Sequence, residues 1–192
     1  MNLILASASS IRRAMLDAAG VAYQVQPSNI DEAKLKGVGD ARTVARRLAE
    51  AKALQVSEAA RDDWVIGGDS VVGVGDRLFD KPVSRDNAVE HLRYFSGKTM
   101  ELSSAVVLAR GGQVDWSHVE TARLQVRDLS QDFIESYLEQ EWPEVGYCVG
   151  VFRMEGRGVQ LFDAVQGDHF SILGMPLIPL LGALRGRGLI AR

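Results

Sequence analysis

A carboxylate inside an apolar strand is the feature of this sequence that most directly suggests chemistry. Asp69 lies in WVIGGDSVVGVG, residues 64–75, where Ser70 is the only other strongly polar residue. A lone carboxylate in such a strand costs several kcal/mol unless it is paired, hydrogen-bonded or bound to a metal. Gly67 and Gly68 before it allow a ligand or another backbone to approach closely. This pattern favours a metal ligand or general base, the alternative being an aspartate at a strand end that caps a turn.

A serine cluster followed by arginine is the second such feature, in LILASASSIRRAML, residues 3–16. Ser7 and Ser9 separate a predicted strand from a predicted helix, and a turn and a helix cap explain both serines. They do not explain Arg12, because a cation near a helix N-terminus opposes the helix dipole by about 0.3–1 kcal/mol. A bound anion reverses that sign, since helix amides, hydroxyls and a guanidinium together form a phosphate cradle.

Lys52 is a lysine on the expected inner face of a helix over residues 41–60. It follows the apolar stripe at i+4 from Leu48. Its side chain can run outward along its aliphatic stem, or it can direct an ammonium group toward phosphate. The position alone leaves both alternatives open.

Further candidate residues lie in segments predicted as loops or as strand-like. Asp31 and Glu32 belong to a polar loop over residues 27–40, and they are ligands for Mg²⁺ or Mn²⁺ only if a third carboxylate lies near them. Lys81 follows the Asp69 strand in a short loop. Glu155 interrupts a largely apolar stretch, residues 149–167, where a neighbouring arginine could pair with it.

The composition limits the function classes. The 192 residues are 46% hydrophobic and 24% charged, which suits a compact domain with a substantial core. A net charge of −3 makes non-specific nucleic-acid binding a poor hypothesis. The sequence contains neither an apolar run of membrane-spanning length nor a secretory signal. Cys148 has no second cysteine to pair with, and the three histidines lie far apart. We therefore expect a cytoplasmic protein with no nucleic-acid or membrane partner and no zinc site.

The hydrophobic periodicity predicts alternating strands and helices. Strands are expected over residues 2–6, 21–25, 64–75, 99–110, 114–130 and 149–167, and helices over residues 10–20, 41–60, 85–97, 131–140 and 176–186. Asp40 and Ser130 are expected to cap helices. The antiparallel pair expected around Gly111 and Gly112 does not fit a uniform parallel series. The order of elements therefore predicts an α/β or α+β fold with a mixed sheet.

Six short motifs carry a resemblance to a known family. LASASSIRR, RRLAEAKA, VIGGDSVV, DKP, FSGKTM and ILGMPL occur in the order and approximate spacing of the Maf family of nucleoside triphosphate pyrophosphatases. The resemblance runs almost from end to end, over a single predicted domain, residues 1–192. It implies an α/β fold with a mixed β-sheet and flanking helices, two lobes around a central cleft as in the inosine triphosphatase fold, and a homodimer. It also implies metal-dependent hydrolysis of a nucleoside triphosphate to the monophosphate and pyrophosphate, in the cytoplasm.

The resemblance also assigns roles to residues. It implies that Asp69 accepts a proton, that Asp69 and Glu32 hold Mg²⁺, Mn²⁺ or Co²⁺, and that the catalytic residues are Asp69, Lys52 and Lys81. The residues expected to bind substrate are Ser7, Ser9, Arg12, Lys52, Lys81 and Glu155.

Two departures from the commonest pattern concern the base. Ile11 stands where many members have arginine, and Glu155, in FRMEGRG, stands where they have glutamine. Both features resemble the 7-methyl-GTP pyrophosphatase branch and argue against the dTTP/UTP branch, which predicts a house-cleaning enzyme for a modified nucleotide. Asp80 and Met100 replace the usual glycine and histidine of two other motifs.

Other functions stay open from the sequence. They are a pyrophosphatase for dTTP, UTP or deaminated purine nucleotides, and a non-catalytic nucleotide-binding regulator of septum formation. Such a regulator would keep the phosphate cradle but would not need Asp69, so the presence of Asp69 with Lys52 and Lys81 argues against it.

Overall fold

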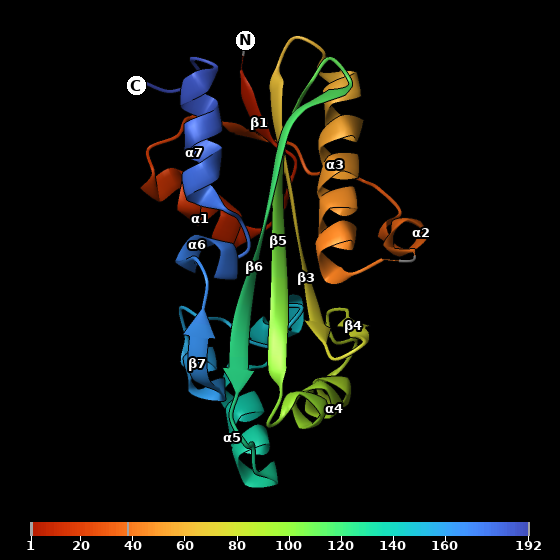
Figure 1. Cartoon of the computed structure of the whole chain (residues 1–192), viewed down its shortest axis with the longest axis vertical. Coiled ribbons are helices and arrows are strands. Elements are labelled where there is room, and N and C mark those ends of the chain that lie inside the picture. Colours follow the sequence, from red (N-terminus) through yellow and green to blue (C-terminus); the bar gives the residue numbers. More distant parts are fainter. Residues whose placement is uncertain (1, 38, 192) are drawn as a thin grey trace. The chain divides into compact units, whose positions relative to one another are not determined.

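The computed structural model describes residues 2–37 and 39–191, so Val38 of the predicted loop lies outside the described residues. The helices are α1 (Ser10–Ala18), α2 (Glu32–Lys36), α3 (Ala41–Ala59), α4 (Arg85–Phe95), α5 (Gln131–Glu141), α6 (His169–Ile172) and α7 (Leu177–Gly186), with 3₁₀ helices η1 (Glu144–Tyr147) and η2 (Arg157–Leu161) (Figure 1). The strands are β1 (Leu3–Leu5), β2 (Gln24–Val25), β3 (Trp64–Val74), β4 (Arg77–Phe79), β5 (Thr99–Arg110), β6 (Gln113–Val126) and β7 (Phe162–Gln166). Within the described ranges, no helix has both the length and the apolar character that crossing a bilayer requires.

The strands form one mixed sheet, as the sequence predicts. Its order is β2-β1-β3-β5-β6-β7, and β4 pairs with β3 beside this path. Strand β1 is parallel to β2 and β3, whereas β4 is antiparallel to β3 and β7 is antiparallel to β6. The expected β5–β6 hairpin is confirmed, because Ser103 bonds Thr121 while Glu101 pairs with Arg123, the register of an antiparallel pair.

The chain divides into two compact units. Unit 1 comprises Met1–Ser70, Ser103–Thr121 and Asp168–Arg192, and unit 2 comprises Val71–Leu102 and Ala122–Gly167. That the whole chain is one domain, and that a cleft lies between two lobes, both stay predictions.

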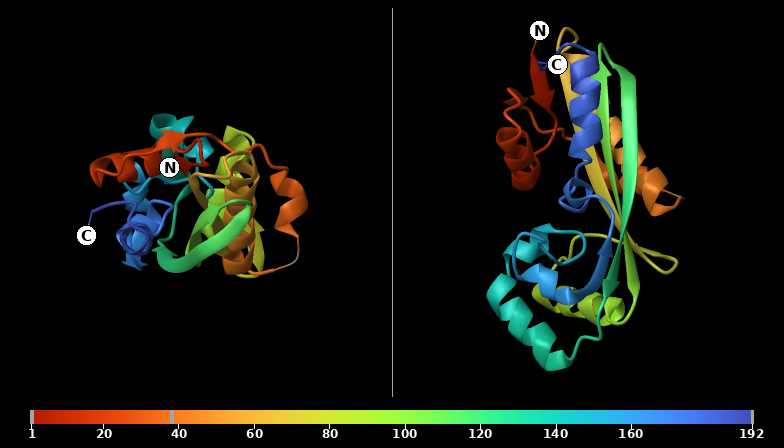
Figure 2. Two further views of the ribbon diagram at one scale, coloured as in Figure 1. Left: turned by 90° about the horizontal axis from the view of Figure 1, so that it is seen from above. Right: turned by 60° about the vertical axis from the view of Figure 1, so that its left-hand side comes forward.

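Unit 1 is built on alternating strand faces. Leu5 of β1 and Ile66 of β3 point to one face, where α1 and α7 pack (Figures 1 and 2). Helix α3 covers the other face, and its residues Ala49 and Ala53 lie directly against Gly67 of β3. Successive residues of a strand point to opposite faces of the sheet. Asp69 and Ser70 of β3 therefore also point to opposite faces.

Unit 2 has its own aromatic cluster. Phe79 of β4 meets the ring of Phe95 edge-on at a centroid distance of 4.7 Å and that of His91 at 5.1 Å. His91 is half-buried, and its Nδ1 has no hydrogen-bond partner among the described residues. Burial lowers the pKa of His91, an effect that the nearby Glu90 opposes.

This histidine predicts a loss of stability in mild acid. An unfolded histidine has a pKa of about 6.5, and the folded value is lower, so the unfolded chain binds a proton first as the pH falls. We expect the free energy of unfolding to fall as the pH is lowered from about 7.5 to about 5.5. Urea unfolding of the native protein and of His91→Gln at both values checks this, since the variant should lose part of that pH dependence. Equal dependence in both proteins would contradict it.

The predicted elements are largely confirmed, with three exceptions. Helices α1, α3, α4, α5 and α7 occur within a few residues of their predicted bounds, and Asp40 and Ser130 cap α3 and α5 as expected. The segments predicted as polar loops contain α2 and β4. The prediction of strand structure over residues 149–167 is wrong, because turns and η2 occupy most of it and only Phe162–Gln166 is a strand. Its glycines permit the turns that break the strand pattern.

Candidate active site

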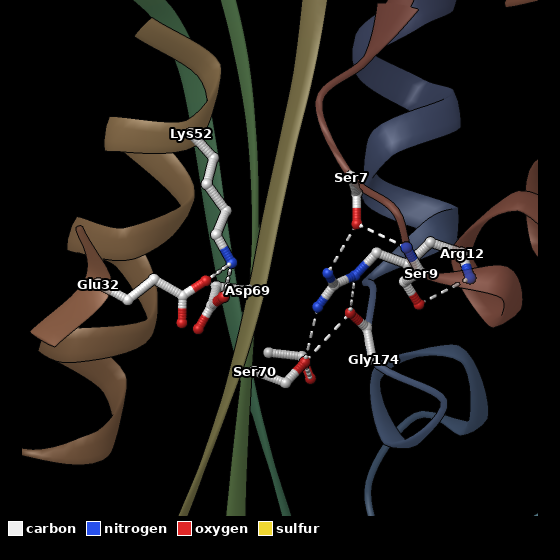
Figure 3. Close-up of polar contacts among 9 residues, drawn as sticks. Ser7, Ser9, Arg12, Glu32, Lys52, Asp69, Ser70 and Gly174 are labelled. Carbon is white, nitrogen blue, oxygen red and sulfur yellow. Dashed lines mark hydrogen bonds and ion pairs between the residues drawn. The ribbon is translucent and has the colours of Figure 1, made fainter. Parts of the chain in front are cut away.

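Arg12 is the centre of a buried polar cluster in unit 1. Helix α1 begins at Ser10, and the Ser9 hydroxyl caps it by accepting from the Arg12 backbone N–H. The guanidinium is buried and donates from Nε to the Gly174 carbonyl (2.9 Å) and from Nη1 to Ser7 Oγ (3.2 Å). A third bond runs from Nη2 to Ser70 Oγ at 3.3 Å (Figure 3). Three hydrogen bonds therefore fix the orientation of the Arg12 guanidinium.

The three acceptors of Arg12 are all neutral. None of the ion pairs among the described residues involves Arg12, and two of its five guanidinium N–H donors have no partner there. Burial lowers the pKa of Arg12, and the charges of Asp69 and Glu32 oppose that shift. A buried cation whose hydrogen-bond acceptors are all neutral and which has spare donors is expected to bind an anion, because the anion compensates the loss of water.

Ser70 links Arg12 to two residues that sequence patterns did not identify. Its hydroxyl lies 2.9 Å from Ser104 Oγ and donates to the Gly174 carbonyl at 3.2 Å. Since it donates to Gly174, its lone pairs are left to accept from Arg12 and Ser104. Gly174 has φ +110, and a Cβ there would lie 3.3 Å from Ser70 Oγ. Its place in the ILGMPL motif was the one signal in the sequence.

Lys52 pairs with two carboxylates on the α3 side of β3. Its Nζ lies 2.5 Å from Asp69 Oδ1 and 2.8 Å from Glu32 Oε1. Only 13% of the Lys52 side chain and 11% of the Asp69 side chain are exposed, so this pair is nearly buried. Helix α2 brings Glu32 to the pair, and strand alternation directs Asp69 toward α3 while Ser70 faces Arg12 (Figure 3). Lys52 thus points inward, and the outward alternative is wrong.

Gly67 allows α3 to approach β3 closely enough for this pair to form. A Cβ on Gly67 would overlap the Ala49 carbonyl oxygen and lie 2.7 Å from Ala53 Cβ. We expect Gly67→Ala to lower the free energy of unfolding by about 1–3 kcal/mol, because the backbone of α3 must shift. Thermal or urea unfolding checks this, with Gly186→Ala as the matched control, since a Cβ there meets nothing within 4 Å. Equal stability of the two variants would contradict the close contact.

The carboxylates of unit 1 fit a divalent cation only together with a ligand. Asp69 and Glu32 supply the hard oxygen atoms that Mg²⁺ and Mn²⁺ prefer. Across residues 2–37 and 39–191, however, no group of three or more His, Cys, Asp or Glu side chains gathers as a metal cluster. Mg²⁺ is often held by one or two carboxylates plus substrate phosphates, and this donor set matches that arrangement.

Lys81 and Glu155 belong to unit 2. Lys81 is exposed beyond β4, and Glu155 is exposed in the turn before η2. Burial raises the pKa of the Cys148 thiol, Glu155 adds to that shift, and Arg153 and Lys81 oppose it. The charges of Lys81 and Glu155 both act on the Cys148 thiol, so the two residues lie near the same cysteine within unit 2.

Comparison with known proteins gives a consistent picture. A family model described as Maf-like protein matches residues 2–187. A 7-methyl-GTP pyrophosphatase of Rhizobium etli is 45% identical, with 98% of each chain covered, and one of Rhizobium meliloti is 44% identical over 98% of this chain and 97% of its own. A nucleoside triphosphate pyrophosphatase of Nitrobacter hamburgensis is 44% identical over 98% of this chain and 95% of its own.

Proposed function

This chain belongs to the Maf-like protein family, and from that premise we propose that it hydrolyses a nucleoside triphosphate to the monophosphate and pyrophosphate. The names of its relatives support this activity, and 7-methyl-GTP is the substrate we propose. The observation that carries the proposal is the buried Arg12 guanidinium, which has neutral acceptors and spare donors. A triphosphate supplies the anion that such a group requires.

In the proposed mechanism, Arg12 and Ser7 bind phosphate oxygens. The Gly174 carbonyl and Ser70 hold the guanidinium plane, so its free N–H groups are oriented before substrate arrives. Ser9 contributes through its cap on α1 and through its N–H, which donates to Ser7 Oγ at 3.3 Å. Donors fixed in advance stabilise charge that develops on the phosphoryl oxygens and on the leaving pyrophosphate.

Asp69 is the proposed general base. Its carboxylate orients a water molecule and takes a proton from it as the water attacks the α-phosphorus. Lys52 forms ion pairs with one oxygen of Asp69 and with Glu32. The Asp69 carboxylate therefore keeps a fixed orientation beside the positive charge of Lys52. Lys52 and the Lys81 ammonium are the further cations that we propose for the phosphates.

Asp69 and Glu32 are the residues that would hold a divalent cation, Mg²⁺, Mn²⁺ or Co²⁺. When bound, such a cation supplies positive charge to phosphate oxygens and favours ionisation of water. Because the described part of the chain offers no third acidic or histidine ligand there, we propose that phosphate oxygens complete the coordination.

The base preference rests on unit 2 and on the branch resemblance. Glu155 is the residue that we propose to contact the base, and Ile11 is the second feature shared with the 7-methyl-GTP branch. Methylation at N7 gives guanine a positive charge, which a carboxylate attracts and a glutamine does not. A cytoplasmic location and a homodimer belong to the same proposal and rest on the family resemblance alone.

A turnover panel tests this function. Purified protein is incubated with 7-methyl-GTP, GTP, dTTP, UTP, ITP and XTP, with Mg²⁺, Mn²⁺ or Co²⁺ in turn, and products are separated by chromatography. We expect monophosphate and pyrophosphate in equal amounts, with the highest kcat/KM on 7-methyl-GTP. A best rate on dTTP, UTP, ITP or XTP would favour the other substrate classes, and binding without turnover would favour a non-catalytic regulator.

A further inference from the structure

The segment before Glu155 is held in a strained conformation within unit 2. Val151 has φ +56, in the left-handed region that β-branched residues rarely adopt. Its side chain is fully buried, its N–H donates to the Cys148 carbonyl at 3.2 Å, and its carbonyl accepts from the Tyr137 hydroxyl at 2.9 Å. Such strain persists only where the surroundings fix the backbone, and it is common next to functional groups. The start of this turn is therefore rigidly placed.

The turn itself closes around Arg153. The Gly156 N–H donates to the Arg153 carbonyl at 3.1 Å. A Cβ on Gly158 would lie 2.6 Å from both the nitrogen and the carbonyl oxygen of Arg153, so only glycine allows the chain to return this closely. Glu155 thus lies in a tight turn that is closed by contacts with the Arg153 backbone.

The Arg153 side chain pairs with Glu141 of α5 and not with Glu155. Its Nη2 lies 3.3 Å from Glu141 Oε2, and the Glu141 side chain is only 7% exposed. None of the ion pairs among the described residues involves Glu155, so of the two alternatives that the sequence left open, pairing with a neighbouring arginine is not the one observed. Burial alone would lower the pKa of Arg153. The pKa is nevertheless raised, because Glu141 accepts a hydrogen bond from Arg153 and because Glu141 and Glu155 are both negatively charged.

The Arg153–Glu141 contact is a single hydrogen bond, and one substitution can remove the charge that strengthens it. Arg153 Nε is buried without a partner, so the guanidinium does not make the two parallel bonds of a bidentate pair. About a third of the Arg153 side chain is exposed, which leaves it free to turn. Without the Glu141 charge, the nearest acidic group on its own turn is Glu155, two residues away.

We propose that Glu141 is a positioning residue that keeps Arg153 away from Glu155, so that the Glu155 carboxylate stays available for a positively charged base. This inference rests on the proposed function, and it deepens the part that concerns 7-methyl-GTP. A carboxylate neutralised by its own arginine would attract a cationic base no better than an amide does, whereas an uncharged guanine would be affected little.

The test compares kcat/KM on 7-methyl-GTP and on GTP for the native protein and Glu141→Gln. We expect the preference for 7-methyl-GTP to fall by about threefold to fivefold, the scale of an exposed ion pair. The double variant Glu141→Gln/Arg153→Gln should recover the native preference, because the competing cation is gone. The matched control is Glu139→Gln, an exposed acid of α5 whose charge is not among those that act on Arg153, and it should leave the preference unchanged. Melting temperatures of all variants check folding.

The outcomes separate this inference from the proposed function. If the native protein hydrolyses neither nucleotide, the function fails. If it prefers 7-methyl-GTP but Glu141→Gln keeps that preference, or the double variant loses it further, the inference fails. Salt gives a second readout, since the defect of Glu141→Gln should shrink between about 0.05 and 0.5 M salt as the exposed Arg153–Glu155 pair is screened. A defect that does not change with salt would indicate a merely structural role.

Discussion

Replacing Arg12 with alanine should lower kcat/KM for the nucleoside triphosphate by about 10²–10³-fold, the usual cost of losing a preorganised donor to a reacting oxyanion. The reason is that Arg12 is buried, fixed by Gly174, Ser7 and Ser70, and still holds spare donors. Steady-state kinetics measure the loss. Pyrophosphate should also raise the melting temperature of the native protein and not that of Arg12→Ala, because ligand binding to the folded state stabilises it.

Arg13→Ala is the matched control for this prediction. Arg13 follows Arg12 on α1 but is exposed, so its loss should change kcat/KM by no more than about twofold. Arg12→Lys is the second variant, because lysine keeps the charge but cannot make three directed bonds. A normal KM and rate for Arg12→Ala would overturn the phosphate role of Arg12, and an equal loss in Arg13→Ala would mean that disruption of α1 explains both.

Asp69→Asn should lower kcat by about 10²–10⁴-fold, the range expected for loss of a general base. Asparagine has nearly the shape of aspartate and can still accept from Lys52, so the contact at 2.5 Å between Lys52 Nζ and Asp69 Oδ1 keeps an acceptor. KM should change less than kcat, since the phosphate-binding residues are intact. Kinetics at saturating Mg²⁺ or Mn²⁺ separate this effect from weakened metal binding.

Asp62→Asn provides the control, because Asp62 is an exposed carboxylate in the turn that leads into β3. It should retain native kcat. Near-native turnover of Asp69→Asn with the metal at saturation would contradict the assignment of the base. A loss that more metal restores would instead assign Asp69 to metal binding alone.

Local patterns predict the elements that carry the site. The period of α1 and its serine cap, and the apolar run of β3 with its single carboxylate, are confirmed because each is encoded within about ten residues of chain. Lys52 was ambiguous for a physical reason: its direction depends on Glu32 and Asp69, which only the folded chain brings to it.

What the sequence left out depends on contacts between distant segments. Gly174 bonds Arg12 across 162 positions, and Ser104 reaches Ser70 across 34, so no local pattern could predict either contact, although Gly174 lies in the ILGMPL motif. The strand assignment for residues 149–167 is wrong because apolar residues such as Val151 and Phe152 are buried in turns of unit 2 and not in a sheet. Periodicity reports burial, and it does not distinguish a buried turn from a short strand.

Hydrolysis of 7-methyl-GTP in ¹⁸O-labelled water is the measurement that tests the central claim most directly. Attack of water on the α-phosphorus predicts one labelled oxygen in 7-methyl-GMP and unlabelled pyrophosphate, as read by mass spectrometry of the separated products. Label in the pyrophosphate, or release of inorganic phosphate with 7-methyl-GDP, would contradict the proposed reaction.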